Sequence, residues 1–311
     1  MAKLIFLRIL QGIMVLLIVS FLIFRLLATV GGDALTALQN YPQMSEKTME
    51  QLRHIYGLDK PFLERYASWV GEAARGNLGQ SIYFQEPVWR VIVPRLMRTG
   101  MLALFALMLA LIISLTLGLM AARWVGSWID RLSQTIELLG SSTPRLLLSL
   151  LALAVVVRVT WLGIESPGLE LSGFEWALRL APPTLVLSTP LIALFLTQTR
   201  VSMSMALNQD FVRVARAKGL PESLIFLRHV LRPSLTPLIT VFGYGLGGVM
   251  SGSVIVEKVL GWPGLGELSV IAVKSRDVPL LMGVVLVTAT AVLIANLLAD
   301  ILLRINDPRL R

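Results

Sequence analysis

The side chains in this sequence that could do chemistry form no recognisable catalytic or metal-binding pattern. Cysteine is absent, which excludes disulfides, thiolate metal ligands and a cysteine nucleophile. There is no Gly-Lys dipeptide and hence no P-loop, and neither a G-x-S-x-G nor an H-E-x-x-H pattern occurs. The two histidines, His54 and His229, have no histidine partner at ligand spacing, so we predict no metal site. The sequence therefore does not predict an enzyme.

The composition places these side chains in a membrane protein. Of 311 residues, 55% are hydrophobic and only 15% are charged, too few to cover the surface of a soluble protein of this length. The net charge of +9 does not indicate nucleic-acid binding, because the basic residues lie between apolar runs instead of forming one polar face. We therefore predict an all-α membrane protein.

Six segments are long and apolar enough to cross a bilayer, which takes roughly 20 apolar residues. The first, 4–29, has charged residues only near its ends, and we interpret it as a retained signal-anchor helix. The segment 133–157 is less apolar and is expected to form one helix. The other four contain no formal charge and are 99–122, 180–199, 233–256 and 278–299.

Four polar side chains within or directly beside these segments are candidates for a functional role. Glu137 and Arg145 are eight residues apart and should project toward similar sides of one helix, and Asn296 and Asp300 share one side of the last helix. Polar groups are costly to bury in lipid, so we predict places on a translocation path for them. An alternative stays open, in which Arg145 extends to the membrane surface and Asp300 lies at the interface beside Arg304.

The distribution of Lys and Arg predicts the orientation. Short segments on the side of the N-terminus carry thirteen of these residues, against five in short segments on the other side. We therefore predict that both termini are cytoplasmic. The expected parts are a first membrane helix (1–30), a periplasmic helical subdomain (31–98), a five-helix core with a cytoplasmic loop at 201–232 (99–304), and a cytoplasmic tail (305–311).

The external segment should contain two amphipathic helices, separated at 57–61. One face of the first would hold Met49, Leu52, Ile55 and Tyr56. One face of the second would hold Phe62, Tyr66, Trp69 and Val70.

A basic segment interrupts the apolar pattern after residue 200. DFVRVARAKGLPESLIFLRHVLRPSL, starting at Asp210, reads as a helix, a turn at Gly219 and a second helix that ends at Pro233, where the next span begins. One interpretation is a helix on the anionic inner leaflet, stabilised by roughly 1 kcal/mol per cation. The other is a docking element for another protein, since small Ala215 and Ala217 beside a sharp turn allow close approach.

This segment resembles the coupling loop of permease subunits of ATP-binding-cassette importers. Its ARAKGLPES and RHVLRPSL are similar to the group that imports dipeptides, oligopeptides and nickel. So are YGLDKPFLERYASWV, GNLGQSI, VIVEKVLGWPGLGELSVIAVKSRDVPLLMG and NDPRLR, in the expected order along nearly the whole chain. Arg213 and Val214 stand where the general motif has Glu and Ala, while Ala215 and Gly219 match it.

The resemblance implies the type I importer permease fold in a bacterial inner membrane. It implies a homologous second permease, two ATPase subunits that bind the ATP and Mg, and a periplasmic or lipid-anchored solute-binding protein, with no cofactor in this chain. Cargo would be short peptides, with nickel or a metal chelate as the alternative. The residues that would couple to an ATPase are Arg213, Ala215, Arg216, Ala217, Lys218, Gly219, Leu220 and Pro221.

Two glycine-rich stretches each have a purely structural and a functional interpretation. In GWPGLGEL, Trp262 belongs either to an aromatic belt at the membrane surface or to a loop that dips into the protein. The resemblance places this loop near an outer gate, with Trp262, Pro263, Gly264 and Gly266. In the preceding span, glycines at 243, 247, 248 and 252 predict close helix packing, within the chain or against a second permease.

Two rival classes of function are kept. A passive channel would conduct solute without ATP, but it leaves the basic loop unexplained. A membrane enzyme would need paired acids or a nucleophile within the spans, and none is convincing in this sequence.

Overall fold

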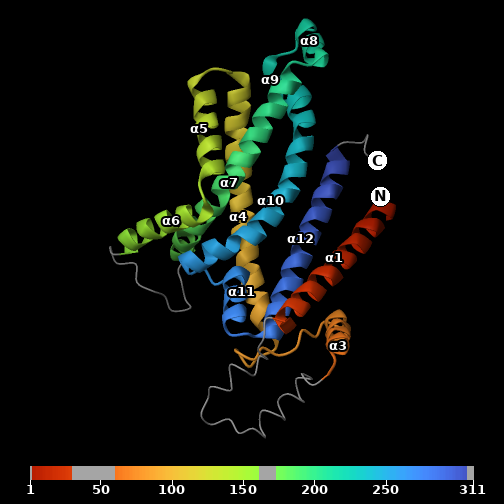
Figure 1. The fold of residues 1–311 in the computed structure, drawn as a ribbon. Coiled ribbons are helices and arrows are strands. Elements are labelled where there is room, and N and C mark those ends of the chain that lie inside the picture. Colours follow the sequence, from red (N-terminus) through yellow and green to blue (C-terminus); the bar gives the residue numbers. More distant parts are fainter. Residues whose placement is uncertain (1, 30–59, 161–172, 307–311) are drawn as a thin grey trace. The chain divides into compact units, whose positions relative to one another are not determined.

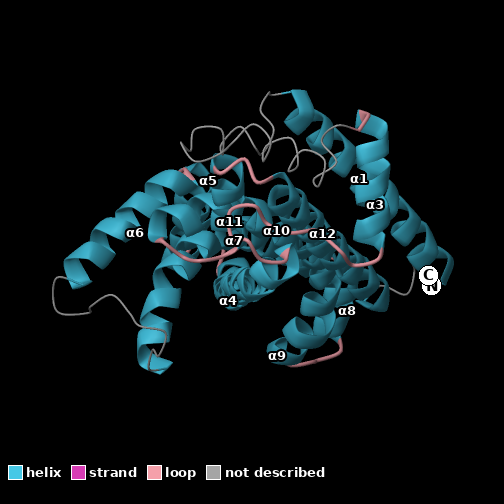
Figure 2. Ribbon diagram, turned by 90° about the horizontal axis from the view of Figure 1, so that it is seen from below, coloured by secondary structure: helices cyan, strands magenta, loops and turns pink. Residues whose placement is uncertain are grey.

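The computed structural model describes residues 2–29, 60–160 and 173–306. In that part of the chain, helices are joined by short loops, and an isolated β-bridge pairs Gln80 with Pro87 (Figure 1 and Figure 2). The chain divides into two compact units: Met1–Thr99 with Pro263–Leu293, and Gly100–Trp262 with Ile294–Arg311. Helices α4 (Val88–Arg123) and α12 (Val278–Asn306) each contribute residues to both units.

In the first unit, α3 (Phe62–Ala74) packs on α1 (Ala2–Thr29) through aromatic rings. The Phe62 and Tyr66 rings lie 5.3–5.6 Å from the rings of Phe21 and Phe24. The Tyr66 hydroxyl also donates a hydrogen bond to the Leu17 carbonyl at 2.9 Å. The predicted shared face of α3 is therefore confirmed for Phe62, Tyr66 and Trp69, whose ring lies 6.5 Å from that of Phe24. The first external helix, with Met49, Leu52, Ile55, Tyr56 and the nearby His54, lies outside the described residues.

A buried carboxylate joins two distant parts of the first unit. Asp277, 1% exposed, accepts hydrogen bonds from the Ser81 hydroxyl at 2.5 Å and from the Tyr83 amide at 3.0 Å. Its other oxygen accepts the Leu280 amide at 3.0 Å and so caps the start of α12. Asp277 thereby ties the loop before α4 to the helix that follows residue 277.

The described residues of the second unit form the rest of α4 and α12 and six further α-helices. They are α5 (Trp128–Ser142), α6 (Arg145–Thr160), α7 (Gly173–Leu207), α8 (Asp210–Ala217), α9 (Glu222–Leu224) and α10 (Leu231–Leu260), with a π-helical turn, η1 (Ile225–Val230), before α10. Helices α4, α7 and α10 share an apolar core in which Leu102, Leu187, Phe195 and Val256 are almost completely buried. Small residues allow close approach: a Cβ at Gly140 of α5 would lie 2.9 Å from the Ala193 Cβ of α7.

Five described helices are long and apolar enough to cross a membrane: residues 5–29, 88–123, 178–207, 222–250 and 278–306. They contain or overlap five of the six predicted spans. The number rises to six if the bent pair formed by α5 and α6 counts as one span. The broad prediction of an all-α membrane protein is confirmed.

The prediction of one continuous helix over 133–157 is wrong. Helices α5 and α6 meet at an angle of 102°. Thr143 is extended, with φ −86° and ψ 121°, because the ring of Pro144 disfavours a helical conformation for the residue before it. The bend places Glu137 and Arg145 on different helices, so they do not share a helix face.

Candidate functional site

The turn after α8 has the hydrogen bonds of a glycine-terminated helix. Gly219 has φ +74°, a conformation that favours glycine. Its amide donates to the Arg216 carbonyl at 2.9 Å, and the Leu220 amide donates to the Ala215 carbonyl at 3.3 Å. This is the Schellman arrangement. The prediction that Gly219 ends the helix is confirmed, and Pro221 follows as the N-cap of α9.

One side of α8 packs on its own unit and the other is exposed. Val212 and Ala215 are buried in a cluster with Met203, Ile225 and Val230. The sequence predicts Ala215 at the surface for a partner, but at 4% exposure it contacts this chain instead.

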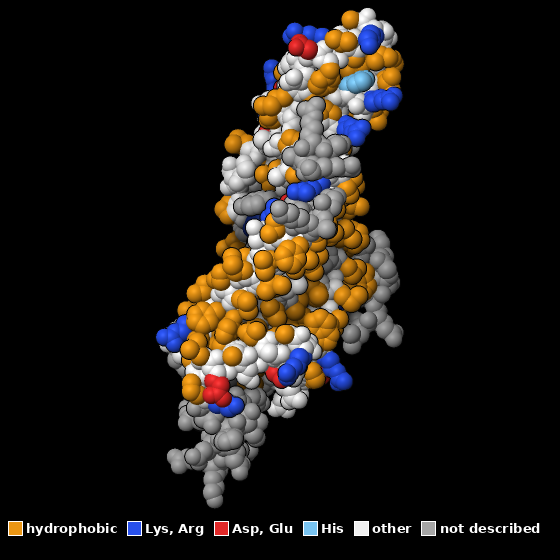
Figure 3. Space-filling model, turned by 90° about the vertical axis from the view of Figure 1, so that its right-hand side faces the viewer, with side chains coloured by type: hydrophobic (Ala, Val, Ile, Leu, Met, Phe, Trp, Pro, Cys, Tyr) orange, Lys and Arg blue, Asp and Glu red, His pale blue; other side chains and the backbone are white. Residues whose placement is uncertain are grey.

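The exposed side of α8 combines apolar and basic side chains. Phe211 is 42% and Val214 is 53% exposed, although both side chains are apolar. Arg213, Ala217 and Lys218 are also exposed. Figure 3 shows Lys and Arg side chains gathered at the end of the second unit that carries α8.

An exposed ion pair connects α8 with α9 across the turn. The Arg216 guanidinium contacts the Glu222 carboxylate, with Nε–Oε1 at 2.7 Å and Nη2–Oε2 at 3.3 Å. The hydrogen bond with Glu222 raises the pKa of Arg216 above its ordinary value. Of the predicted coupling cations, Arg216 is therefore engaged within the loop, and Arg213 makes an exposed pair with Asp210 at 3.5 Å.

The second half of the basic loop is continuous with the next span. Helix α9, η1 and α10 follow one another without a break from Glu222 to Leu260. The sequence predicts a separate helix ending at Pro233, and this detail is wrong. The wide π-helical turn at Ile225–Val230 comes just before Pro233, which has no amide hydrogen to donate to a regular helical bond. The α8–α9 turn is therefore joined to α10 by continuous helix.

A charged cluster cross-links α5 and α7. The Arg200 guanidinium contacts both Glu137 oxygens, at 3.0 and 3.3 Å, and one Asp130 oxygen at 3.5 Å. The Asp130 and Glu137 side chains are only 6% and 12% exposed. Glu137, predicted to lie on a translocation path, is thus engaged with Arg200.

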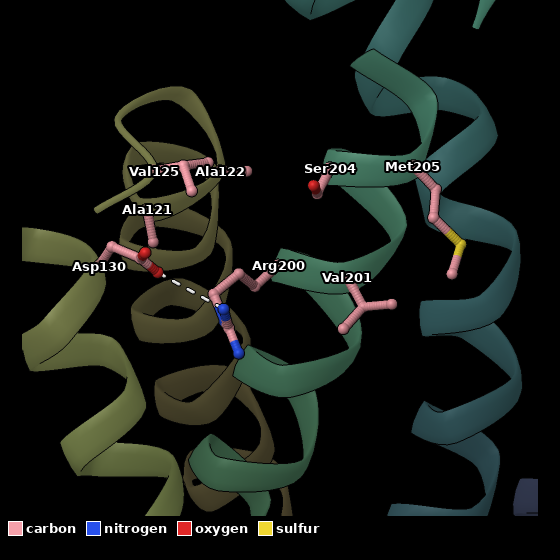
Figure 4. Close-up of a pocket in the computed structure, with 8 residues that line it drawn as sticks. All are labelled: Ala121, Ala122, Val125, Asp130, Arg200, Val201, Ser204 and Met205. Carbon is pink, nitrogen blue, oxygen red and sulfur yellow. Dashed lines mark hydrogen bonds and ion pairs between the residues drawn. The ribbon is translucent and has the colours of Figure 1, made fainter. Parts of the chain in front are cut away.

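Figure 4 shows Asp130 and Arg200 facing each other at a cavity of about 230 Å³. The other lining residues are Ala121, Ala122, Val125, Val201, Ser204 and Met205.

Arg145 occupies an unexpected place on the glycine face of α10. Its Nη1 donates to the Gly248 carbonyl at 3.2 Å. A Cβ at Gly252 would overlap the guanidinium, whereas a Cβ at Gly248 would lie 4.0 Å from Nη2. Gly243, by contrast, packs helix against helix, because its Cβ would lie 2.5 Å from the Ala299 Cβ of α12. The helix-packing prediction therefore holds for Gly243, but Gly252 accommodates a side chain.

The GWPGLGEL loop is buried and not part of an exposed aromatic belt. In the second unit, Trp262 is 6% exposed, and its ring centroid lies 5.6 Å from that of Trp176. In the first unit, Gly264 caps α11 (Leu265–Lys274), and the Leu265 amide donates to the Thr99 hydroxyl at 2.8 Å. Pro263 is half-buried and Gly266 is buried. The interpretation as a loop buried within protein is favoured.

The remaining predicted path residues lie on α12. Asn296 is exposed and Asp300 is half-buried. They are one helical turn apart, as the sequence predicts.

Sequence reasoning missed the roles of Arg200, Asp130 and Asp277. Arg200 ends a charge-free apolar run, and Ser127 with Asp130 has the spacing of a helix cap, which the structure confirms through the Asp130 amide and the Ser127 hydroxyl at 3.3 Å. Neither signal identifies the partner across the fold. The link between Ser81 and Asp277 joins residues 196 positions apart, which no local pattern predicts.

The fold and these elements define a multi-pass, all-helical membrane protein with a two-part basic loop between two spans. Two family models match it. Residues 114–311 match the binding-protein-dependent transport system inner membrane component. Residues 1–103 match the N-terminal part of membrane components of such systems.

Relatives match the chain from end to end. A Brucella suis protein provisionally named a peptide permease is 38% identical over 310 residues, covering 98% of this chain and 97% of the relative. The oligopeptide transport system permease protein AppB of Bacillus subtilis is 36% identical over 315 residues, covering 100% and 99%. The glutathione transport system permease protein GsiC of Escherichia coli is 33% identical over 305 residues, covering 98% and 97%.

The chain therefore belongs to the inner-membrane components of binding-protein-dependent transport systems, the permease subunits of ATP-binding-cassette importers. The resemblance stated from its motifs is confirmed, and so is its place in an inner membrane.

Proposed function

We propose that this permease subunit imports short peptides by alternating access. The similar proteins named above are described as permeases for peptides, oligopeptides and glutathione, which is chemically a tripeptide. Within the described residues there is no group of three or more His, Asp or Glu side chains that could hold a metal ion, so nothing there favours nickel as cargo.

The exposed side of α8 is the proposed contact with an ATPase subunit, and this surface is the observation that carries the mechanism. Phe211, Val214 and Ala217 would enter a groove, and Arg213 and Lys218 would steer the loop toward acidic groups beside it. Ala215, Gly219, Leu220 and Pro221 would act indirectly, by seating α8 and setting the turn.

The proposed complex contains this chain, a homologous permease, two ATPase subunits and a periplasmic or lipid-anchored solute-binding protein. The ATPases would bind ATP and Mg and supply the energy. Both termini and α8 would face the cytoplasm, in keeping with the excess of Lys and Arg on that side. Trp262 and Pro263–Gly266 would form part of the outer gate, and Asn296 and Asp300 would contribute to the translocation path.

Gly219→Glu tests the coupling role. At φ +74° a glutamate is strained, and its negative charge would meet the acidic groups expected on the ATPase. We expect the variant to insert and assemble in membranes, while peptide-stimulated ATP hydrolysis falls at least about tenfold, equivalent to a loss of about 1.4 kcal/mol. The measurement is ATPase activity of the reconstituted complex with and without peptide-loaded binding protein.

Gly126→Glu is the matched control. Gly126 has φ +80° and, like Gly219, has open space around its Cβ position, but it belongs to the α4–α5 turn. Similar losses in both variants would assign the effect to backbone strain, and normal coupled turnover in Gly219→Glu would refute the coupling role. Peptide flux through the purified chain without ATP would instead support a passive channel.

A further inference from the structure

The ionic surroundings of Arg145 differ from those of Arg200 in the same unit. Arg200 contacts two carboxylates. Among the described residues, the Arg145 guanidinium has one hydrogen bond, to a main-chain carbonyl, and no ion pair. A guanidinium carries five N–H donors, so most of those on Arg145 have no protein acceptor in that part of the chain. Within the described residues, no carboxylate neutralises this cation, so an anion from outside that part of the chain can pair with it.

The structure also holds this guanidinium in a defined position. Arg145 is the first residue of α6, directly after the bend at Pro144, and its half-buried side chain lies across α10. Gly248 offers its carbonyl, and the missing side chain of Gly252 leaves the volume that the guanidinium fills. An ionisable side chain inside a membrane protein marks a functional position by default, because burying a charge there is costly.

We propose that Arg145 binds the C-terminal carboxylate of the peptide during its passage, an inference that rests on the proposed import of peptides. Short peptides of different sequence share this carboxylate, so it is the group that a permease of broad peptide range can recognise. The planar guanidinium offers two parallel N–H donors that match the two carboxylate oxygens. Arg145 is therefore a substrate-contacting residue, unlike Glu137, which is held by Arg200.

The experiment pairs a change in the protein with a change in the peptide. The complex is purified through a tag on this chain, reconstituted in vesicles, and supplied with tri-alanine or tri-alanine amide. We expect Arg145→Gln to lower the uptake efficiency for tri-alanine about tenfold or more, and to leave that for the amide within about twofold of the unmodified chain. For Arg145→Lys we expect an uptake efficiency for tri-alanine between those of the unmodified chain and Arg145→Gln. Lysine keeps the positive charge but lacks the two parallel N–H donors of the guanidinium.

The ratio of the uptake efficiency for tri-alanine to that for the amide measures the contribution of Arg145 to carboxylate recognition. Any preference of other subunits for the carboxylate is the same in every variant and cancels. Uptake of the amide also reports that the variant is folded and assembled. Equal losses for acid and amide would overturn the proposal and assign Arg145 to helix packing or to a lipid phosphate. No uptake of either peptide by the unmodified complex would refute peptide import itself.

Two glycine variants provide a second comparison that leaves the arginine in place. Gly252→Ala must displace the guanidinium, so we expect it to lower the preference for tri-alanine over the amide as Arg145→Gln does. Gly100→Ala is the control: it adds a methyl group on α4 where nothing lies within 4 Å, so it should stay within about twofold of the unmodified chain. An unchanged preference in Gly252→Ala would contradict the proposed position of the guanidinium.

Discussion

Replacing Arg200 with alanine is expected to lower the free energy of unfolding by about 3–5 kcal/mol, the usual cost of leaving a buried charge without its partner. Asp130 and Glu137 both face this guanidinium with side chains 6% and 12% exposed. Without it, two carboxylates would repel each other at the contact between α5 and α7. The loss can be measured by denaturant titration of the purified chain in detergent micelles.

Arg216→Ala is the matched control, because Arg216 also contacts a carboxylate through two nitrogens, but at an exposed position. Its loss should cost much less than that of Arg200, because water screens an exposed ion pair. The double variant Arg200→Ala with Glu137→Ala should cost less than the sum of the two single losses, since it removes charges of both signs together. A loss below about 1 kcal/mol for Arg200→Ala would show that the cluster is not a structural cross-link.

The helices of this protein follow from its apolar segments, because only regular helices and closed barrels satisfy main-chain hydrogen bonds in lipid. The end of α8 was equally predictable, since Gly219 and Pro221 restrict the backbone locally. The bend between α5 and α6 was signalled by Pro144, but neither its size nor the direction of Arg145 follows from a local pattern. Helical spacing alone therefore wrongly placed Glu137 and Arg145 on one face.

The partners of the charged residues depend on tertiary contacts. Arg200 looks like an ordinary basic residue at the end of an apolar run, yet α5 brings Asp130 and Glu137 to it. Gly252 looks like a helix-packing residue, yet α6 brings Arg145 there. In both cases the contact partner comes from a segment more than 60 positions away in the sequence. The residue type alone therefore does not predict the contact.

A second large effect is expected for Asp277→Ala, which should lower the free energy of unfolding by about 4 kcal/mol. The carboxylate is 1% exposed, and its loss leaves the Ser81 hydroxyl and the Tyr83 and Leu280 amides without their acceptor. Each buried donor left unsatisfied costs about 1–3 kcal/mol. The same denaturant titration measures the total loss.

Hydrogen exchange can locate the effect of Asp277→Ala, because two of the three donors are main-chain amides. We expect peptides covering Tyr83 and Leu280 to exchange faster in the variant, while peptides from α8 in the second unit keep their protection. Asp210→Ala is the control, since that carboxylate is 93% exposed and its removal should cost at most about 1 kcal/mol. If Tyr83 and Leu280 keep their protection in Asp277→Ala, Asp277 does not join the loop before α4 to α12.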